Sequence, residues 1–272
     1  MLVRIASLTE RPLSFFRSIS YRRIDSTPNS ASREMNFDDL DSDGTKCVNL
    51  RLCNVSGCMT EILEIHADQP SLHVVFVPGN PGAITFYKEF VESLFEFLGG
   101  TASLLSYVSD QLLALQVIQK RLSLRRSRVL STTVTLFVAL LGLLPRRVLR
   151  VISELSNGKS WSNTAHEAAC SHLPQYHTIR NVLYMARTEF IKLSETPDWN
   201  FMRENQEKIS FLYGIDDHWG PLQMFEEVSR QASGIALSIE REGHTHGFCC
   251  SEAGSIWVAR HAASLIKNKL AN

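Results

Sequence analysis

The chain has 272 residues, of which 44% are hydrophobic and 21% charged, and this predicts one globular domain with extensions. Basic and acidic residues balance at 28 each, so the sequence argues against a nucleic-acid partner, whose phosphates require a basic surface. Six cysteines show neither C-x-x-C spacing nor the density of a disulfide scaffold. We therefore expect reduced thiols, with no metal site and no cofactor.

The N-terminal 44 residues differ in composition from the rest. Five arginines, several serines and a single glutamate occur within residues 1–23, a composition typical of an organellar transit peptide. A disordered leader, or untranslated sequence before a true translation start at Met35, fits equally well. The sequence thus predicts a leader over residues 1–44 and a folded domain over residues 45–272.

The first part of that domain predicts a strand, a tight turn and a helix. Alternating apolar and polar residues over 48–52 and 59–65 predict an edge β-hairpin. The continuous apolar run 73–77 predicts a central strand buried on both faces. The turn Pro78-Gly-Asn-Pro-Gly82 follows, and apolar residues at helical spacing predict a helix over 84–98.

Residues 104–128 break this alternation, because they carry neither a turn nor the pattern of a buried strand. The uncharged run 131–144 follows, with arginines on both sides. It is shorter than the roughly 20 apolar residues that span a membrane. It is either a core or lid helix, or a segment that dips into a lipid surface and anchors on head groups. The lipid-contacting side chains would be Phe137, Leu140, Leu141, Leu143 and Leu144.

The remaining chain predicts helices within 161–199, strands over 209–213 and 235–239, and helices over 221–231 and 255–270. Alternation of strands and helices indicates an α/β fold. The helices of about residues 129–200 would form a cap over the functional site.

Two residues follow strands in the positions that a serine hydrolase of the α/β class uses for its acid and base. Asp217 follows the strand 209–213 and His246 follows the strand 235–239, in the chain order that this class requires. Asp216 and His244 are the competing acid and base. The pattern predicts that Asp217 orients His246.

The nucleophile of such a hydrolase stands in a G-x-S-x-G turn between a strand and a helix. No serine of this chain has that pattern. Ser160 comes nearest, with a glycine two residues before it and a serine two residues after, but it follows a predicted helix and is a weak candidate. The turn 78–82 occupies the place of the loop that forms the oxyanion hole, and Gly79 and Asn80 are the candidate residues.

The segments VFVPGNPGAITFYKEF, YGIDDHWGP and EREGHTHGF resemble the lipid droplet-associated hydrolase family, in the form of its plant members. The resemblance covers residues 46–103 and 129–270. It implies an α/β-hydrolase fold with a helical cap, with the acid at Asp217, the base at His246 and the oxyanion loop at residues 78–82. By this resemblance, residues 104–128 lack a counterpart in the family. The nucleophile turn and the central strands around it are then missing from this chain. Such a gap indicates altered splicing or a frame-shifted gene model.

The resemblance implies a serine esterase or lipase that acts on neutral lipid esters at the surface of the lipid droplet or endoplasmic reticulum. Because the serine turn is absent, we expect this form to be inactive. The alternative function is non-catalytic binding to the droplet surface. The arginine-rich N-terminus leaves a plastid or mitochondrion as the alternative location.

Overall fold

The computed structural model describes residues 2–4, 48–55, 58–107, 128–157, 160–193, 195–244 and 246–271. The predicted leader lies outside these residues, apart from the strand β1 (Leu2–Arg4). Most of the stretch 104–128 also lies outside them.

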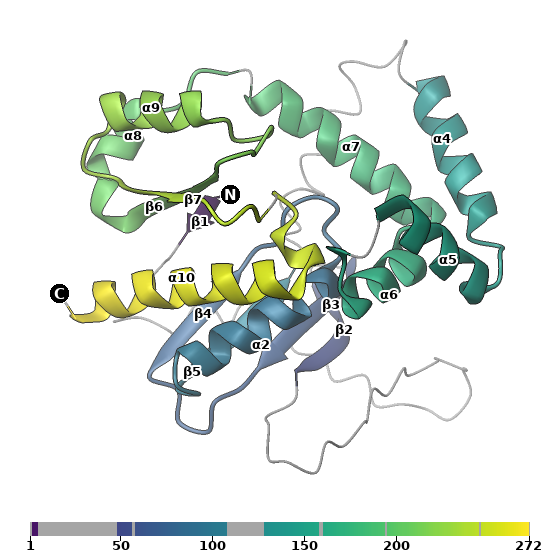
Figure 1. Ribbon diagram of the computed structural model, residues 1–272, viewed down its shortest axis with the longest axis horizontal. Helices are drawn as coiled ribbons and strands as arrows, with labels where there is room; N and C mark the ends of the chain where they lie inside the picture. Colours follow the sequence, from purple (N-terminus) through teal and green to yellow (C-terminus); the bar gives the residue numbers. More distant parts are fainter. Residues whose placement is uncertain are drawn as a thin grey trace.

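The described strands form two sheets on either side of the long C-terminal helix (Figure 1). The larger has the order β2-β3-β5-β4, with strands β2 (Asn49–Val55), β3 (Cys58–Ile65), β4 (Leu72–Phe76) and β5 (Ala102–Tyr107). Its β2–β3 pair is antiparallel and confirms the predicted hairpin, whereas β4 and β5 run parallel.

The smaller sheet has the order β1-β6-β7, with β6 (Ile209–Gly214) and β7 (Ala236–Glu240) parallel to each other. The carboxyl ends of parallel neighbours meet at one edge, so the loops after β6 and β7 lie side by side. This sheet packs with the short helices α8 (Trp199–Glu204) and η3 (Gln206–Lys208) and with α9 (Leu222–Gln231) around Ile209, Val228 and Ile235.

The main core lies between the larger sheet and two helices that run side by side (Figure 1). These are α2 (Lys88–Phe97), which follows the short helix η1 (Ile84–Tyr87), and α10 (Glu252–Ala271). Both present a stripe of small and apolar side chains to the core, as the helical spacing of their sequences requires. The short helix η4 (Phe248–Cys250) adds the ring of Phe248, which packs against Phe90 at 5.4 Å between centroids.

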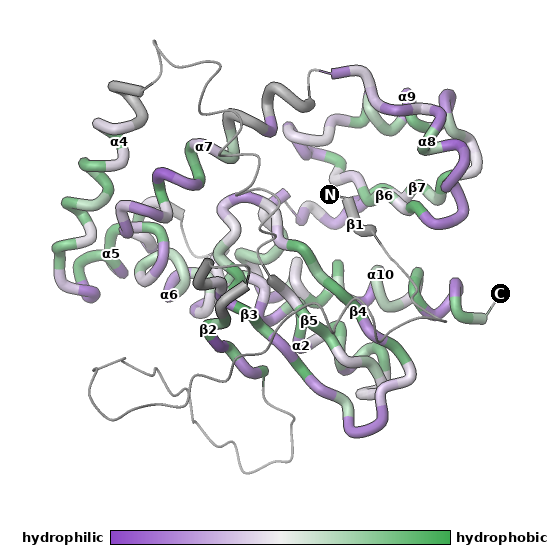
Figure 2. The backbone as a smooth tube through the Cα atoms, turned by 180° about the vertical axis from the view of Figure 1, so that it is seen from behind, coloured by the Kyte–Doolittle hydropathy of each residue, from purple (hydrophilic) through white to green (hydrophobic). Residues whose placement is uncertain are grey.

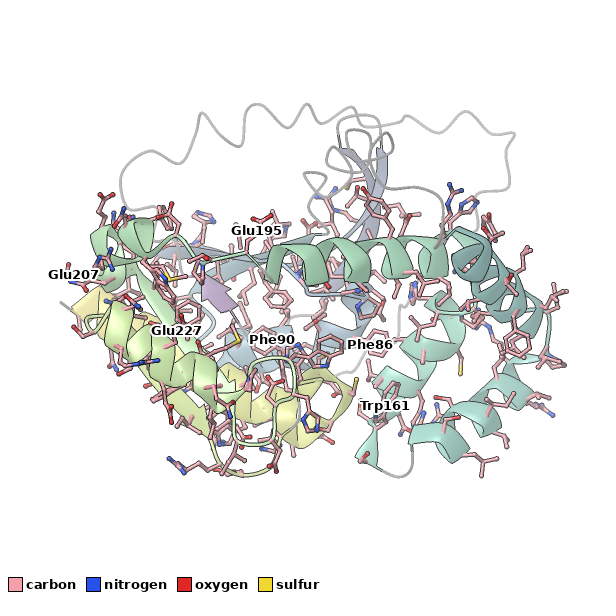
Figure 3. The ribbon with its side chains drawn as sticks, turned by 90° about the horizontal axis from the view of Figure 1, so that it is seen from above. Phe86, Phe90, Trp161, Glu195, Glu207 and Glu227 are labelled. Carbon is pink, nitrogen blue, oxygen red and sulfur yellow. The ribbon has the colours of Figure 1, made fainter. Side chains whose placement is uncertain are left out.

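Four helices lie within the described residues 128–193, and they confirm the helical character predicted for this part of the chain. They are α4 (Arg128–Leu141), α5 (Arg146–Asn157), α6 (Asn163–His172) and α7 (Tyr176–Leu193). Helix α4 packs on α7, and α5 packs on α6. The group reaches the core through Phe86 and Trp161, whose rings meet edge to face at 6.1 Å (Figure 3).

Two expectations about strands were wrong. Strand β4 pairs only with β5 among the described residues, and alternate side chains on it face solvent, so it is neither central nor buried on both faces. Residues 102–107 form strand β5 although no buried strand was predicted beyond residue 104. Its buried side chains are Ala102, Leu104 and Ser106, a period of two that is too short and too weakly apolar to be conspicuous in the sequence.

Truncation of Phe90 tests this core. Its ring is buried and contacts Phe76 and Phe248, so we expect Phe90→Ala to lower the free energy of unfolding by about 3–5 kcal/mol. Urea denaturation of the full chain measures the loss. Leu270→Ala, at an exposed position of α10, is the control and should change the free energy by less than about 0.5 kcal/mol. Equal effects of the two changes would contradict this assignment of the core.

Candidate active site

Asp217 lies in the turn that follows β6 and is buried. Its Oδ1 accepts hydrogen bonds from the backbone N–H groups of Trp219 at 2.8 Å and Gly220 at 3.1 Å. Glycines make room for this carboxylate, since a Cβ atom on Gly214 would stand 3.2 Å from the Cβ of Asp217. The backbone of this turn therefore holds the carboxyl group of Asp217 in place without the help of another side chain.

His246 lies in the loop between β7 and η4, and its Nδ1 is 2.8 Å from Oδ2 of Asp217. The two side chains differ in exposure, at 48% for His246 and 4% for Asp217. The arrangement is a buried carboxylate that orients a half-exposed imidazole, as in the acid–base pair of a serine hydrolase. The structure thus brings together the two residues that the sequence singled out, whereas the competing acid Asp216 is exposed.

Electrostatics keep Asp217 ionised. Burial on its own would raise the pKa of Asp217, but the hydrogen bonds from His246, Trp219 and Gly220 outweigh burial and bring the pKa below its ordinary value of 3.8. The charged carboxylate can only accept a hydrogen bond, so Nδ1 of His246 carries the proton of the pair.

A small pocket beside the pair contains a second carboxylate that the sequence analysis missed. Glu240, at the end of β7, is almost fully buried and lines this pocket together with Asp217, His244 and His246. Its Oε1 accepts a hydrogen bond from the backbone of Glu242, and its Oε2 is buried without a partner among the described residues. In the sequence Glu240 looks like an ordinary strand-end charge, and only its burial distinguishes it.

The predicted oxyanion loop lies next to the loop of the base. Its glycines close a turn in which the N–H of Gly82 donates to the carbonyl of Gly79 at 2.7 Å. Tyr87, which follows this loop, packs on Phe248 with 6.0 Å between ring centroids. The side chain of Asn80 donates to the carbonyl of Val182 at 3.2 Å, which ties the loop to helix α7. A role of Gly79 and Asn80 in an oxyanion hole stays a prediction.

Ser160 and the two neighbouring cysteines, Cys249 and Cys250, do not lie in the strand-to-helix turn that holds the nucleophile of a serine hydrolase. Ser160 is exposed and lies between helices α5 and α6, not at a corner between a strand and a helix. The adjacent thiols of Cys249 and Cys250 form a hydrogen bond, which raises the pKa of Cys249, assisted by burial, and lowers the pKa of Cys250. Cys249 is buried against Tyr87, whose own pKa burial raises, so this pair belongs to the packing beneath the base loop.

Most of the predicted lipid-contacting side chains face solvent. Phe137, Leu140, Leu143 and Leu144 are exposed, and Leu141 is partly buried. The sequence analysis missed a second exposed apolar stripe on α5, formed by Val148, Val151, Ile152 and Leu155. The helical spacing of these four residues was visible in the sequence, but it did not indicate whether the stripe faces the core or solvent.

Within the described ranges, the side chains present no cluster of three or more potential metal ligands. Across the same residues, no helix combines the length and apolar character needed to cross a membrane.

Replacing Asp217 tests the acid–base pair through stability. The depressed pKa means that ionised Asp217 stabilises the fold above its ordinary pKa of 3.8, and this contribution is lost as pH falls through its lower folded pKa. We expect Asp217→Asn to cost about 1.5–3 kcal/mol near neutral pH, the value of a hydrogen bond to a charged group, and the difference to shrink below about pH 4. Chemical denaturation across this pH range measures it.

Asp216→Asn is the matched control, because Asp216 is the exposed neighbour of Asp217 in the same turn. It should leave the pH dependence of stability unchanged. A loss of stability for Asp217→Asn that is the same at pH 3 and pH 7 would contradict the ionised pair.

Comparison with solved structures finds proteins of similar architecture at low identity. A thioesterase domain from the curacin biosynthetic pathway has a TM-score of 0.48 at 10% identity, over 82% of this chain and 99% of that one. A serine hydrolase involved in carbazole degradation has a TM-score of 0.48 at 11% identity, over 83% and 99%. A curated relative, the lipid droplet-associated hydrolase of Gallus gallus, is 31% identical over 70 residues, which are 26% of this chain. The match spans about a fifth of that protein, at 21% of its length.

A family model described as "Lipid-droplet associated hydrolase" matches residues 111–249, just over half of the chain. The matched range contains Asp217 and His246. It also includes residues 111–128, so the expectation that the whole stretch 104–128 lacks a counterpart in the family was wrong for those residues. The chain belongs to the lipid-droplet associated hydrolase family.

Proposed function

We propose that this chain docks on the surface of lipid droplets through an apolar face of α4 and α5, and that it does not hydrolyse esters through a serine nucleophile. The observation that carries the proposal is the exposure of two neighbouring apolar helix faces with arginines between them. We call this surface the α4–α5 face. It consists of Leu136, Phe137, Leu140, Leu143, Leu144, Val148, Val151, Ile152 and Leu155.

Helix α5 supports the proposal through the opposite character of its two sides. Val148, Val151 and Leu155 face solvent, whereas Leu149 and Ser153 are buried. The buried side is held in place, since Ser153 hydrogen-bonds to His166 of α6 at 2.8 Å. An amphipathic helix whose polar contacts face the protein and whose apolar stripe faces outward is suited to lie in a lipid interface.

Helix α4 lies next to α5, and both contain many hydrophobic residues (Figure 2). One side of α4 packs on α7, and its exposed side continues through the turn 142–145 to the start of α5. Arg146 and Arg147 are exposed where the two helices meet. Cations at the edge of an apolar face favour anionic lipid head groups, so apolar burial and charge both promote docking.

Exposure of the run 131–144 supports lipid contact over a position in the core. A core helix would bury Phe137 and Leu140, and each such side chain would contribute about 1.5–3 kcal/mol on burial. Both are exposed in the chain. Apolar side chains gathered in this way on a surface mark an interaction site, and the names of the family and of the avian relative point to the lipid droplet.

Loss of serine chemistry is supported by the sequence. The chain contains no G-x-S-x-G turn, and loss of a nucleophile costs several orders of magnitude in rate. The family resemblance is the basis for three further suggestions: hydrolysis of neutral lipid esters, a role in lipid storage and a location at the endoplasmic reticulum. The alternative location in a plastid or mitochondrion is based on the composition of residues 1–44.

Charge placed on the α4–α5 face tests docking. We expect Leu140→Glu and Leu155→Glu each to lower binding of the full chain to a triacylglycerol emulsion coated with phosphatidylcholine by at least about tenfold, because the carboxylate opposes burial in lipid. Flotation of the emulsion measures binding. Leu52→Glu is the matched control, since Leu52 on β2 is 63% exposed and Leu140 is 62% exposed. Equal losses for Leu52→Glu and Leu140→Glu would contradict docking through this face.

A serine-directed probe tests the catalytic half of the proposal. We expect the purified chain to remain unlabelled by a fluorophosphonate, because His246 has no serine in the required turn to activate. In-gel fluorescence measures labelling, with heat-denatured chain as the control for nonspecific reaction. Strong labelling that Ser160→Ala abolishes would overturn this part of the proposal and would identify Ser160 as the nucleophile.

A further inference from the structure

The ring of His246 hydrogen-bonds to Asp217 through one nitrogen and is partly exposed to solvent. Its Nδ1 donates to the buried Asp217 at 2.8 Å, and its ring hydrogen-bonds to no other residue among those that the structure describes. In the neutral imidazole with its proton on Nδ1, Nε2 has a free lone pair. Almost half of the side chain is exposed to solvent.

The surroundings of the ring suit a base that becomes positive during a reaction. The negative carboxylate of Asp217 touches the ring, and Glu240 lines the same pocket from the end of β7. Preorganised negative charge stabilises an imidazolium as it forms. Trp219 stands beside His246 with 6.2 Å between ring centroids, and its exposed indole offers an apolar wall for an acyl group.

We propose that the Asp217–His246 pair acts as a general base that directs water onto activated acyl esters or thioesters, without an acyl-enzyme. Nε2 of His246 takes a proton from water while the water oxygen bonds to the acyl carbon. The tetrahedral intermediate then breaks its bond to the leaving oxygen or sulfur. The leaving group takes the proton from the imidazolium, so the products are a carboxylic acid and a phenol or thiol.

The exposure of His246 restricts the proposed activity to substrates with good leaving groups. A half-exposed histidine without a positioned nucleophile gives little help to a poor leaving group. Aryl oxides and thiolates depart with little assistance, whereas the alkoxide of a glycerol or sterol ester does not. This activity therefore differs from neutral-lipid hydrolysis, and it does not depend on docking through the α4–α5 face.

Hydrolysis of p-nitrophenyl butyrate by the full-length chain tests the inference. We expect His246→Asn and Asp217→Asn each to lower kcat/KM by at least about tenfold, the lower range for loss of a general base. His218→Asn and Asp216→Asn are the matched controls, because both residues are exposed in the turn that contains Asp217. They should retain the rate of the unaltered chain. His246 is half-exposed, so its replacement leaves the core intact, and a thermal unfolding scan confirms folding for each variant.

Three further measurements separate this route from others. The reaction should be slower in D₂O, because a proton moves in the rate-limiting step, and intact-mass analysis during turnover should find no acylated chain. Prior treatment with a fluorophosphonate should leave the rate unchanged. Equal rates for His246→Asn and His218→Asn, an acyl adduct on His246, or complete inhibition by the fluorophosphonate would each overturn the inference. Only the last of these outcomes would also count against the proposed function.

Discussion

The packing of α2 against α10 is the interaction on which the rest of this molecule depends. The two sheets share no ladder among the described residues, so backbone hydrogen bonds do not join the half that contains β4 to the half that contains β6. Apolar contact between the two helices joins these halves instead, and Phe248 extends the contact to Phe90 and Tyr87. A side-chain core thus does what a continuous sheet does in a doubly wound α/β domain.

This joint also positions the acid–base pair. Asp217 is fixed from the smaller sheet by the backbone of its own turn, whereas His246 precedes η4, which is anchored in the main core by Phe248. The contact between Nδ1 of His246 and Oδ2 of Asp217 therefore depends on the packing of the two halves against each other. Of the two side chains, the carboxylate of Asp217 is buried in the protein, whereas the imidazole of His246 is partly exposed to solvent.

The sequence was sufficient for features that depend on local pattern and strand order. The helices, the hairpin, and the meeting of Asp217 with His246 follow from periodicity and from the rule that adjacent parallel strands end at the same edge. The sequence was insufficient where the burial of a residue depends on which other element packs against it. Strand β4 has the composition of a central strand, yet its exposure depends on a partner strand that its own residues cannot specify. Burial of Glu240 and exposure of the α5 stripe are likewise properties of the assembled fold.

The proposed docking surface and the proposed general base lie in separate parts of this chain. The α4–α5 face is built on helices between β5 and β6, whereas the acid–base pair is built on the loops after β6 and β7. The two parts have no residue in common, since the α4–α5 face includes neither the turn that contains Asp217 nor the loop that contains His246. Each of the two proposed functions therefore has its own structural basis in this chain.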